Sequence, residues 1–219
     1  MKKIKFTILV LIVAASFISA QSKVGIGIGG VFASPSGDMG DMFKSGFGGL
    51  GSVTYDVSKS LQLSLTTGYM SFGFNNDFFN DQLKEAGINV TVDVDATLAI
   101  IPIMVGGKYF LSQANFKPYL AAAAGVHISE ITAKSVTVGG VTMDAIQEAS
   151  ETKGAFEAGV GFLYKLSPKL NLDINGKINF NGTEFKKERT TTSGSVTTTE
   201  TSESTAMFFS IYAGLQLEL

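Results

Sequence analysis

The sequence predicts an all-β fold, an eight-stranded antiparallel up-and-down barrel, and three observations lead to it. Apolar and polar residues alternate with a period of two along several segments, which is the pattern of strands with one apolar face. The links between these segments alternate between long and short. The chain has no cysteine to form disulfides, and after residue 20 no apolar segment is long enough for a membrane-spanning helix.

Residues 1–20 are predicted to be a cleaved signal peptide. Three lysines precede an apolar run at residues 6–17, and a small residue, Ala20, ends the segment. We expect cleavage between Ala20 and Gln21, which leaves a barrel domain of residues 21–219. An uncleaved anchor is the alternative, and the shortness of the apolar run argues against it.

The first four strands are predicted at residues 23–33, 47–56, 61–72 and 98–111. The first sets valine, isoleucine and phenylalanine against glycines, which suit a narrow interior. The second and third set aromatic and aliphatic residues against small or polar ones. The fourth alternates in the same way but contains Pro102. Because proline cannot donate to a ladder, we expect Pro102 to mark a bulge or a strand end.

The last four strands are predicted at residues 119–129, 155–165, 170–180 and 208–219. The fifth contains a run of alanines, but Gly125 and the short length argue against a helix. The sixth and eighth set large apolar residues against smaller or more polar ones. The seventh alternates without a slip over eleven residues, with leucine, isoleucine and phenylalanine on one face and asparagine, aspartate and lysine on the other.

The lengths of the links predict which end of the barrel is extracellular and which is periplasmic. Short links are expected at residues 57–60, 112–118 and 166–169, and long ones at 34–46, 73–97, 130–154 and 181–207. This order places every long link at one end, as in a transmembrane β-barrel with long extracellular loops and short periplasmic turns. We expect a short helix at residues 77–86, ended by Gly87, and an extension of the last two strands as a hairpin.

A soluble barrel such as a lipocalin has the same alternation turned inside out, so the direction of each face needs its own argument. The polar face has many small residues and few charges, which suits a narrow interior better than a solvated surface. Aromatic residues on the apolar face gather near both strand ends, as in interfacial girdles. They are Tyr55, Tyr109 and Tyr164 at the short turns, and Phe32, Phe47, Tyr69, Phe156, Phe180 and Phe209 at the long links.

Residues 68–72 (GYMSF), 101–110 (IPIMVGGKYF) and 116–120 (FKPYL) resemble the small outer-membrane β-barrel protein family, similar in architecture to OmpX and the OmpA barrel. The resemblance covers essentially the whole mature chain and implies a location in the outer membrane. It also implies contact with outer-membrane lipid and lipopolysaccharide, and folding by the barrel-assembly machinery. Leu219 stands where such barrels usually end in an aromatic residue, and we expect no peptidoglycan-binding domain after the eighth strand.

Charged residues on the inward face are predicted to close the lumen. Glu157 and Lys177 fall nearly opposite each other, so we expect a buried ion pair joined by Asp173 and Lys108. The alternative is that each charge is hydrated in a water-filled interior.

The only histidine, His127, lies two residues before Ser129 on the same face. A His-x-Ser pair resembles part of the lipid A deacylase barrels, in which an acidic group orients the histidine. No third member is identifiable here, so a structural histidine at the rim is the favoured interpretation. We expect no metal site and no cofactor.

The function that follows is that of a non-enzymatic barrel with a side-chain-filled lumen, acting through its extracellular loops in adhesion, surface protection or envelope integrity. The alternatives are a minor porin for small solutes and a lipid-modifying enzyme. We expect a monomer with an extracellular ligand of unknown identity. With 17 basic and 19 acidic residues and no basic patch, the chain does not suit nucleic-acid binding.

Overall fold

The computed structural model describes residues 24–193 and 196–219, and within them all side chains except those of residues 145–146 and 183–205. The predicted signal peptide, with its cleavage site between Ala20 and Gln21, lies outside the described residues.

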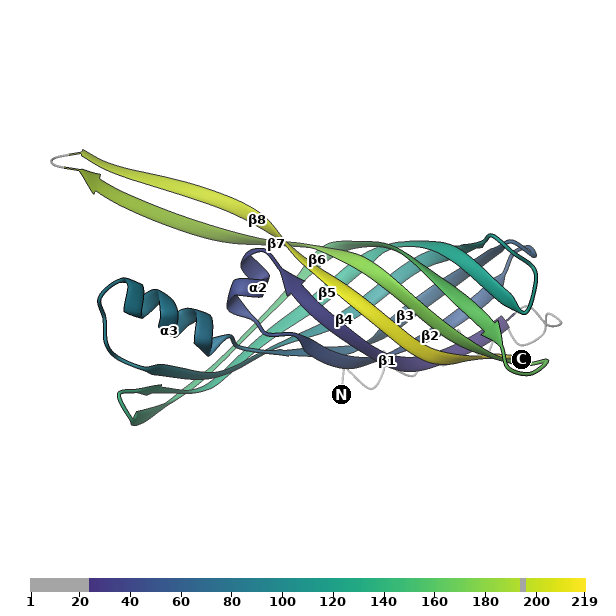
Figure 1. Ribbon diagram of the computed structural model, residues 1–219, viewed down its shortest axis with the longest axis horizontal. Helices are drawn as coiled ribbons and strands as arrows, with labels where there is room; N and C mark the ends of the chain where they lie inside the picture. The colour runs from purple at the N-terminus through teal and green to yellow at the C-terminus, as the bar shows by residue number, and fades with distance from the viewer. Residues whose placement is uncertain (1–23, 194–195) are drawn as a thin grey trace.

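The strands of the described chain close into a barrel in which each strand pairs antiparallel with the next and β1 pairs with β8 (Figure 1). Their bounds are β1 Val24–Ser36, β2 Gly46–Asp56, β3 Leu61–Gly73, β4 Val92–Phe110, β5 Phe116–Val138, β6 Val141–Lys165, β7 Leu170–Ser193 and β8 Val196–Glu218. The predicted eight-stranded up-and-down barrel is therefore confirmed.

The two ends of the barrel differ in their connections. Residues 57–60, 111–115 and 166–169 join strands at one end, which we call the turn end. The connections after β1, β3 and β5 all lie at the opposite end, which we call the long-connection end, as does the pair of Ser193 of β7 with Val196 of β8. The C-terminus lies at the turn end (Figure 1). The predicted division of the connections between the two ends is confirmed, but their lengths do not all follow the prediction, since only two residues separate β5 from β6.

The expectation of a long loop at residues 130–154 is wrong. β5 and β6 continue through this segment as a paired hairpin whose turn consists of Gly139 and Gly140, with φ of 57° and 87°. Two residues with positive φ form the turn that best matches the twist of a hairpin, and glycine adopts it without strain. The Gly-Gly pair between two runs that alternate valine with threonine is a signal that the sequence contains. The expected extension of β7 and β8 is confirmed, since they reach Ser193 and Val196.

Pro102 marks neither a bulge nor a strand end, contrary to expectation. It lies inside β4, opposite His127 of β5. On the β3 side, the pairs on either side of it, Thr67 with Ile103 and Met70 with Ile100, share one register. The ladder between β3 and β4 is therefore interrupted locally at Pro102, and the pairs on both sides of the proline hold β4 in place.

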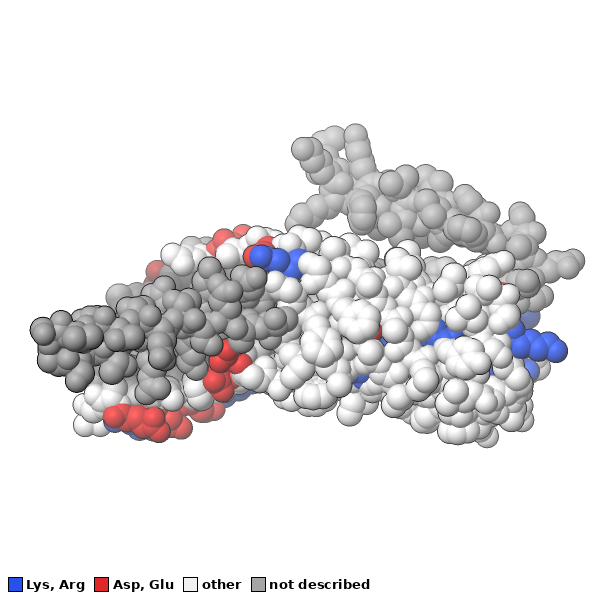
Figure 2. All heavy atoms as spheres, turned by 90° about the horizontal axis from the view of Figure 1, so that it is seen from above, with Lys and Arg blue, Asp and Glu red and all other residues white. Residues whose placement is uncertain are grey.

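The outer surface of the barrel is apolar between two rings of aromatic side chains. Each predicted girdle residue is exposed on this surface, at the turn end and at the long-connection end. Figure 2 shows an almost uncharged band between acidic residues at one end and basic residues at the other. β6 crosses this band between Phe156 and Tyr164, close to the roughly 9–11 residues of a membrane-spanning strand. None of the described helices is long and apolar enough to cross a membrane.

Two helices lie at the long-connection end. α2 (Asp38–Met42) was not predicted and follows β1. α3 (Asn76–Glu85) confirms the predicted helix, and Gly87 follows it with a φ of 79°. The side chain of Asn75 caps α3 by accepting a hydrogen bond from the Phe78 amide at 3.4 Å.

α3 docks on a strand edge through two asparagines one turn apart. The Asn80 side chain accepts from the Val92 amide and donates to the Val92 carbonyl, both at 2.8 Å. Asn76 does the same at Val94, at 2.8 and 3.2 Å. Because β3 pairs with β4 only as far as Thr97, this part of β4 would otherwise present a bare edge. The asparagines thus take the place of a neighbouring strand.

An ion pair also ties α3 to the segment after α2. Lys44 Nζ lies 2.7 Å from Asp77 Oδ2, and this hydrogen bond and the lysine charge lower the pKa of the Asp77 carboxyl. A lowered pKa in the folded state means that the contact is fully present above the usual aspartate range. It is lost as the pH falls through the lowered value. Both side chains are exposed, so the contact is weak and screened by salt.

We expect Asn80→Ala to speed hydrogen exchange at the Val92 amide, because the substitution removes both hydrogen bonds, each contributing a net of about 0.5–1.5 kcal/mol. Asn76→Ala should act in the same way at Val94. Gln82→Ala, at an exposed position of α3, is the matched control. Equal exchange in the Asn80 and Gln82 variants, measured by NMR of the refolded barrel, would contradict the docking role.

Candidate functional site in the barrel lumen

The inward face of β7 supplies the polar centre of the lumen. Alternation along the strand turns Asp173, Asn175, Lys177 and Asn179 inward, as predicted, and leaves its leucines and isoleucines on the outer face. Asp173, Asn175 and Asn179 are buried and Lys177 is partly buried. A period of two is sufficient to place these groups on one face.

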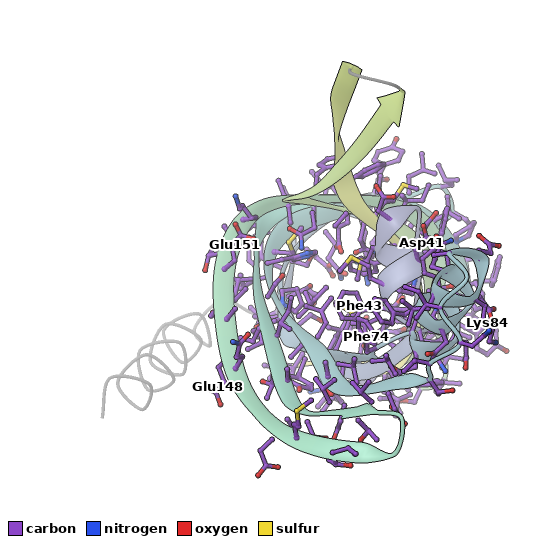
Figure 3. All side chains as sticks on the ribbon, turned by 90° about the vertical axis from the view of Figure 1, so that its left-hand side faces the viewer. Asp41, Phe43, Phe74, Lys84, Glu148 and Glu151 are labelled. Carbon is purple, nitrogen blue, oxygen red and sulfur yellow. The ribbon has the colours of Figure 1, made fainter. Side chains whose placement is uncertain are left out.

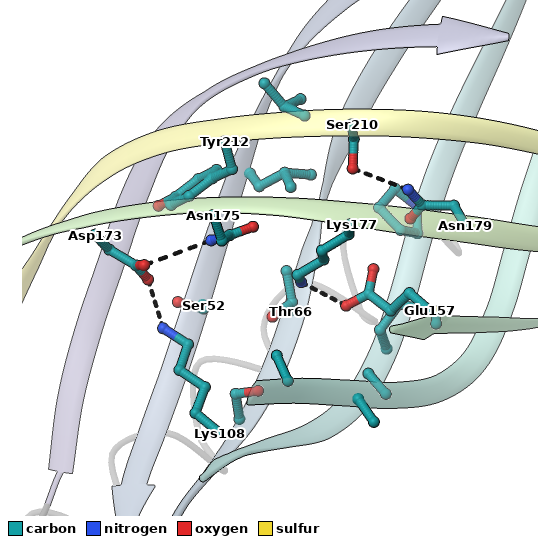
Figure 4. A pocket seen from close by; sticks show the side chains of 18 of the residues that line it. Ser52, Thr66, Lys108, Glu157, Asp173, Asn175, Lys177, Asn179, Ser210 and Tyr212 are labelled. Atoms are coloured by element: carbon teal, nitrogen blue, oxygen red, sulfur yellow. Dashed lines mark hydrogen bonds and ion pairs between the residues drawn. The ribbon is translucent and has the colours of Figure 1, made fainter. Parts of the chain in front are cut away.

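Asp173 is the most connected acceptor in this centre (Figure 4). Lys108 Nζ of β4 lies 2.5 Å from Oδ2, and Tyr119 Oη of β5 donates to Oδ1 at 2.6 Å. Asn175 Nδ2 donates to Oδ1 at 3.4 Å. Since β5 and β6 separate β4 from β7 in the barrel, the Lys108–Asp173 contact spans the lumen. Tyr119 is a partner of Asp173 that the sequence pattern did not predict.

A second pair joins neighbouring strands. Lys177 Nζ of β7 lies 2.6 Å from Glu157 Oε1 of β6, and the two side chains are only 16% and 11% exposed. Beside it, Asn179 Nδ2 donates to Ser210 Oγ at 2.8 Å and to the Phe208 carbonyl at 3.3 Å. Charges that are this buried are stable only when paired, and here each has its partner.

The structure brings together the four charged residues predicted for the lumen, but as two pairs instead of one network. Asp173 and Lys177 are four residues apart on the same strand, which separates them by roughly 13 Å along β7. That distance is too long for an ion pair, so each residue uses a partner from another strand.

Glycines make room for the large side chains of this centre. A Cβ atom on Gly161 would lie 2.7 Å from Cζ of Tyr119, and one on Gly29 would lie 2.8 Å from Cζ of Tyr212. Both distances are shorter than carbon atoms tolerate. The rings therefore occupy space that only a glycine leaves free, which accounts for glycine at positions 29 and 161.

Apolar side chains close the lumen toward the long-connection end. This apolar plug comprises Val31, Ala33, Met39, Phe43, Met70, Phe72, Leu98, Ile100, Ala206, Phe208 and Tyr212, all buried. Phe72 and Phe208 meet edge to face at 5.8 Å. The bridge between Phe43 and Phe74 holds the end of α2 against β3. The plug was not predicted, although the sequence contains a signal for it in strand segments that are apolar on both faces, such as residues 98–101.

The rest of the lumen is equally well filled. Phe110, Tyr119 and Leu163 form a buried cluster at the turn end. Among the polar residues lies a cavity of only about 50 Å³, lined by Thr66 and Lys177 among others, which has room for a few water molecules. The described side chains thus divide the lumen into an aromatic layer, an ionic layer and an apolar plug.

His127 and Ser129 face the lumen, and no hydrogen bond joins their side chains in the described part of the chain. The His127 ring is buried at 6.0 Å from the ring of Phe208, and within the described residues neither of its nitrogens has a hydrogen-bond partner. Ser129 Oγ instead accepts from Asn181 Nδ2 at 3.4 Å. A general base must lie within hydrogen-bond reach of its nucleophile, and this arrangement does not provide that contact.

Comparison with known proteins agrees with this architecture. The family model for the outer membrane protein beta-barrel domain matches residues 6–217. Neisserial surface protein A (NspA) is similar in structure, with a TM-score of 0.53, 16% identity, and coverage of 90% of this chain and 97% of that one. A major outer membrane protein from Thermus thermophilus also has a TM-score of 0.53, with 12% identity over 89% and 99% of the two chains. None of the curated protein sequences compared matches this chain.

We expect Asp173→Asn to lower the free energy of unfolding by about 3 kcal/mol, because it leaves the buried Lys108 charge without a counter-ion. The measurement is a urea titration in lipid vesicles, with the folded fraction taken from gel mobility without heating. Asp81→Asn, which breaks the exposed pair with Lys84, is the control and should cost less than about 0.5 kcal/mol. Equal losses in the two variants would show that the lumen pair is not a stability determinant.

Proposed function

This chain belongs to the outer membrane protein beta-barrel domain family, and on this premise we propose that it is a non-enzymatic protein that acts through an extracellular wing. It is an outer-membrane protein, so the long-connection end is extracellular and the turn end is periplasmic. The wing consists of α3 together with residues 92–97 of β4, 130–138 of β5 and 141–154 of β6.

The length of the wing is the observation that carries this proposal. β6 crosses the apolar band between Phe156 and Tyr164, yet it begins at Val141. The part outside the band extends on the order of 50 Å along the strand. It pairs with β5 almost to the turn, where Val138 faces Val141. A barrel that only had to span the membrane would not need such an ordered sheet beyond it, whereas a contact surface would.

The charge of the wing favours a positively charged partner. The acidic residues are Asp77, Asp81, Glu85, Asp93, Asp95, Glu130, Asp144, Glu148 and Glu151, against Lys84, Lys134 and Lys153. Figure 2 shows acidic side chains gathered at this end of the molecule. Complementary charge steers association and selects partners, and its effect depends on salt. Adhesion to a cationic surface is therefore the role that we propose.

The filled lumen supports this role over that of a porin. Two ion pairs and the apolar plug occupy the space that a channel would need. The separation of His127 from Ser129 likewise supports a non-enzymatic protein over a lipid-modifying enzyme.

We expect adhesion to be lost when the outer part of the hairpin is removed. The deletion removes residues 132–138 and 141–148 and keeps Gly139 and Gly140 as the turn. This turn then connects Ile131 to Ala149, which already face each other in the sheet. Cells that carry the full chain should bind a positively charged surface. Their binding should weaken as salt rises from about 0.15 to about 1 M, because the screening length falls from about 8 to about 3 Å. Cells that carry the shortened chain should bind no better than cells without it.

The control for this deletion is the barrel itself. The shortened chain should keep the heat-dependent gel mobility of a folded barrel, since the ion pairs and the plug remain. Undiminished, salt-independent adhesion by the shortened chain would refute the role of the wing.

We also expect the full chain to show no steady conductance in planar lipid bilayers, because the described side chains leave a cavity of only about 50 Å³ in the lumen. Insertion should be verified by recovery of the folded band from the same membranes. Reproducible conductance steps from folded protein would favour the porin alternative.

A further inference from the structure

A second and larger cavity, of about 400 Å³, lies at the extracellular mouth of the barrel. The apolar plug forms its floor through Met39, Phe43 and Ile100. β5 and β6 form its wall through Ile131 and Ala149. Its volume falls within the roughly 300–1,000 Å³ of sites that bind small molecules. It is distinct from the small cavity among the lumen charges, which has different lining residues.

The cavity leaves an apolar side chain incompletely packed. Ile131 lines it and is 39% exposed, whereas Leu98 and Ile100 in the floor are buried. Covering such a surface with the apolar part of a ligand is favourable by roughly 25 cal/mol per Å² of area removed from water. Ser129 and Asn181, joined by a hydrogen bond of 3.4 Å, supply polar groups beside this surface. The lining therefore suits an amphiphile, with an apolar body and one polar end.

The charge at the rim of the cavity determines which polar group of an amphiphile is favoured there. Glu151 is the charged member among the described residues that line the cavity. Figure 3 looks into this end of the barrel, with Phe43 and Asp41 on the side of α2, and Glu148 and Glu151 on the side of β6. Lys153 pairs with Glu151 at 2.8 Å, but both side chains are substantially exposed, and such pairs exchange partners at little cost. A positively charged end is favoured here, and a carboxylate is disfavoured.

We propose that this cavity binds a small cationic amphiphile, with its alkyl chain against Ile131 and Ile100 and its ammonium group at Glu151. The proposal goes beyond adhesion by the wing, because the hairpin deletion described above removes neither wall of the cavity. The two proposals can therefore fail separately.

The test uses the full chain in lipid nanodiscs, with isoleucine methyl groups labelled for NMR, and decylammonium and decanoate as probes of equal chain length. Decylammonium should shift the methyl signals of Ile100 and Ile131 in a saturable way. Decanoate should bind more weakly by up to about fivefold, as expected for one exposed charge contact. Ile28 and Ile211 are exposed on the outer surface of the barrel and report partition into lipid alone.

Three variants distinguish binding in the cavity from partition of the probe into lipid. Ala149→Phe fills the cavity and should weaken decylammonium binding at least about tenfold, equivalent to 1.4 kcal/mol. Thr152→Phe, an exposed position on the opposite face of β6, is the matched control and should leave binding unchanged. Glu151→Lys should reverse the preference between the two probes, which a purely structural role of Glu151 would not do.

Two results would overturn the proposal. One is a set of shifts confined to Ile28 and Ile211, which would mean that the probes enter the lipid only. The other is equal affinity for both probes that Glu151→Lys leaves unchanged. Should Ala149→Phe fail to give a folded band, the Glu151→Lys comparison decides the question by itself.

Discussion

The narrow lumen of an eight-stranded barrel is the constraint on which the rest of this structure depends. An interior of this width is just filled by side chains, so every inward residue must fit its neighbours and every inward charge must find a partner. Asp173 meets this demand by accepting from Lys108 and Tyr119 across the lumen. Gly161 contributes to the fit by leaving space for the ring of Tyr119. The narrow width of the lumen therefore explains both the packing of its side chains and the pairing of its charges.

Because side chains fill the lumen, the surfaces that can contact a partner lie at the extracellular end. Below the plug, two cations pair with two anions beside a cavity of about 50 Å³. Above it, β5 and β6 stand outside the membrane as an acidic sheet. The bare edge of β4 in this region would invite association with other chains, but Asn76 and Asn80 of α3 satisfy it. An ordered wing with a covered edge can present side chains to a partner without pairing strand to strand.

Much of the barrel could be predicted from the sequence, while the contacts between strands that are not neighbours could not. The turns at residues 57–60 and 166–169 follow from the breaks in alternation and match the structure. Lys177 lies beside Glu157, as expected for inward residues on consecutive strands. The Lys108–Asp173 contact joins strands that are not neighbours, so it depends on how the sheet closes and on the stagger of its strands. Local periodicity contains no information on either.

The sequence assigns one side of each strand to lipid and the other to the lumen, because a period of two separates the faces and the small residues and aromatic girdles distinguish them. It also determined the two aromatic girdles and the common end of the long connections. The tertiary structure brought Met39 and Phe43 into one plug with residues of β3, β4 and β8. It also created the cavity at the mouth. These features arise where segments far apart in the sequence meet, and a closed barrel is what brings them together.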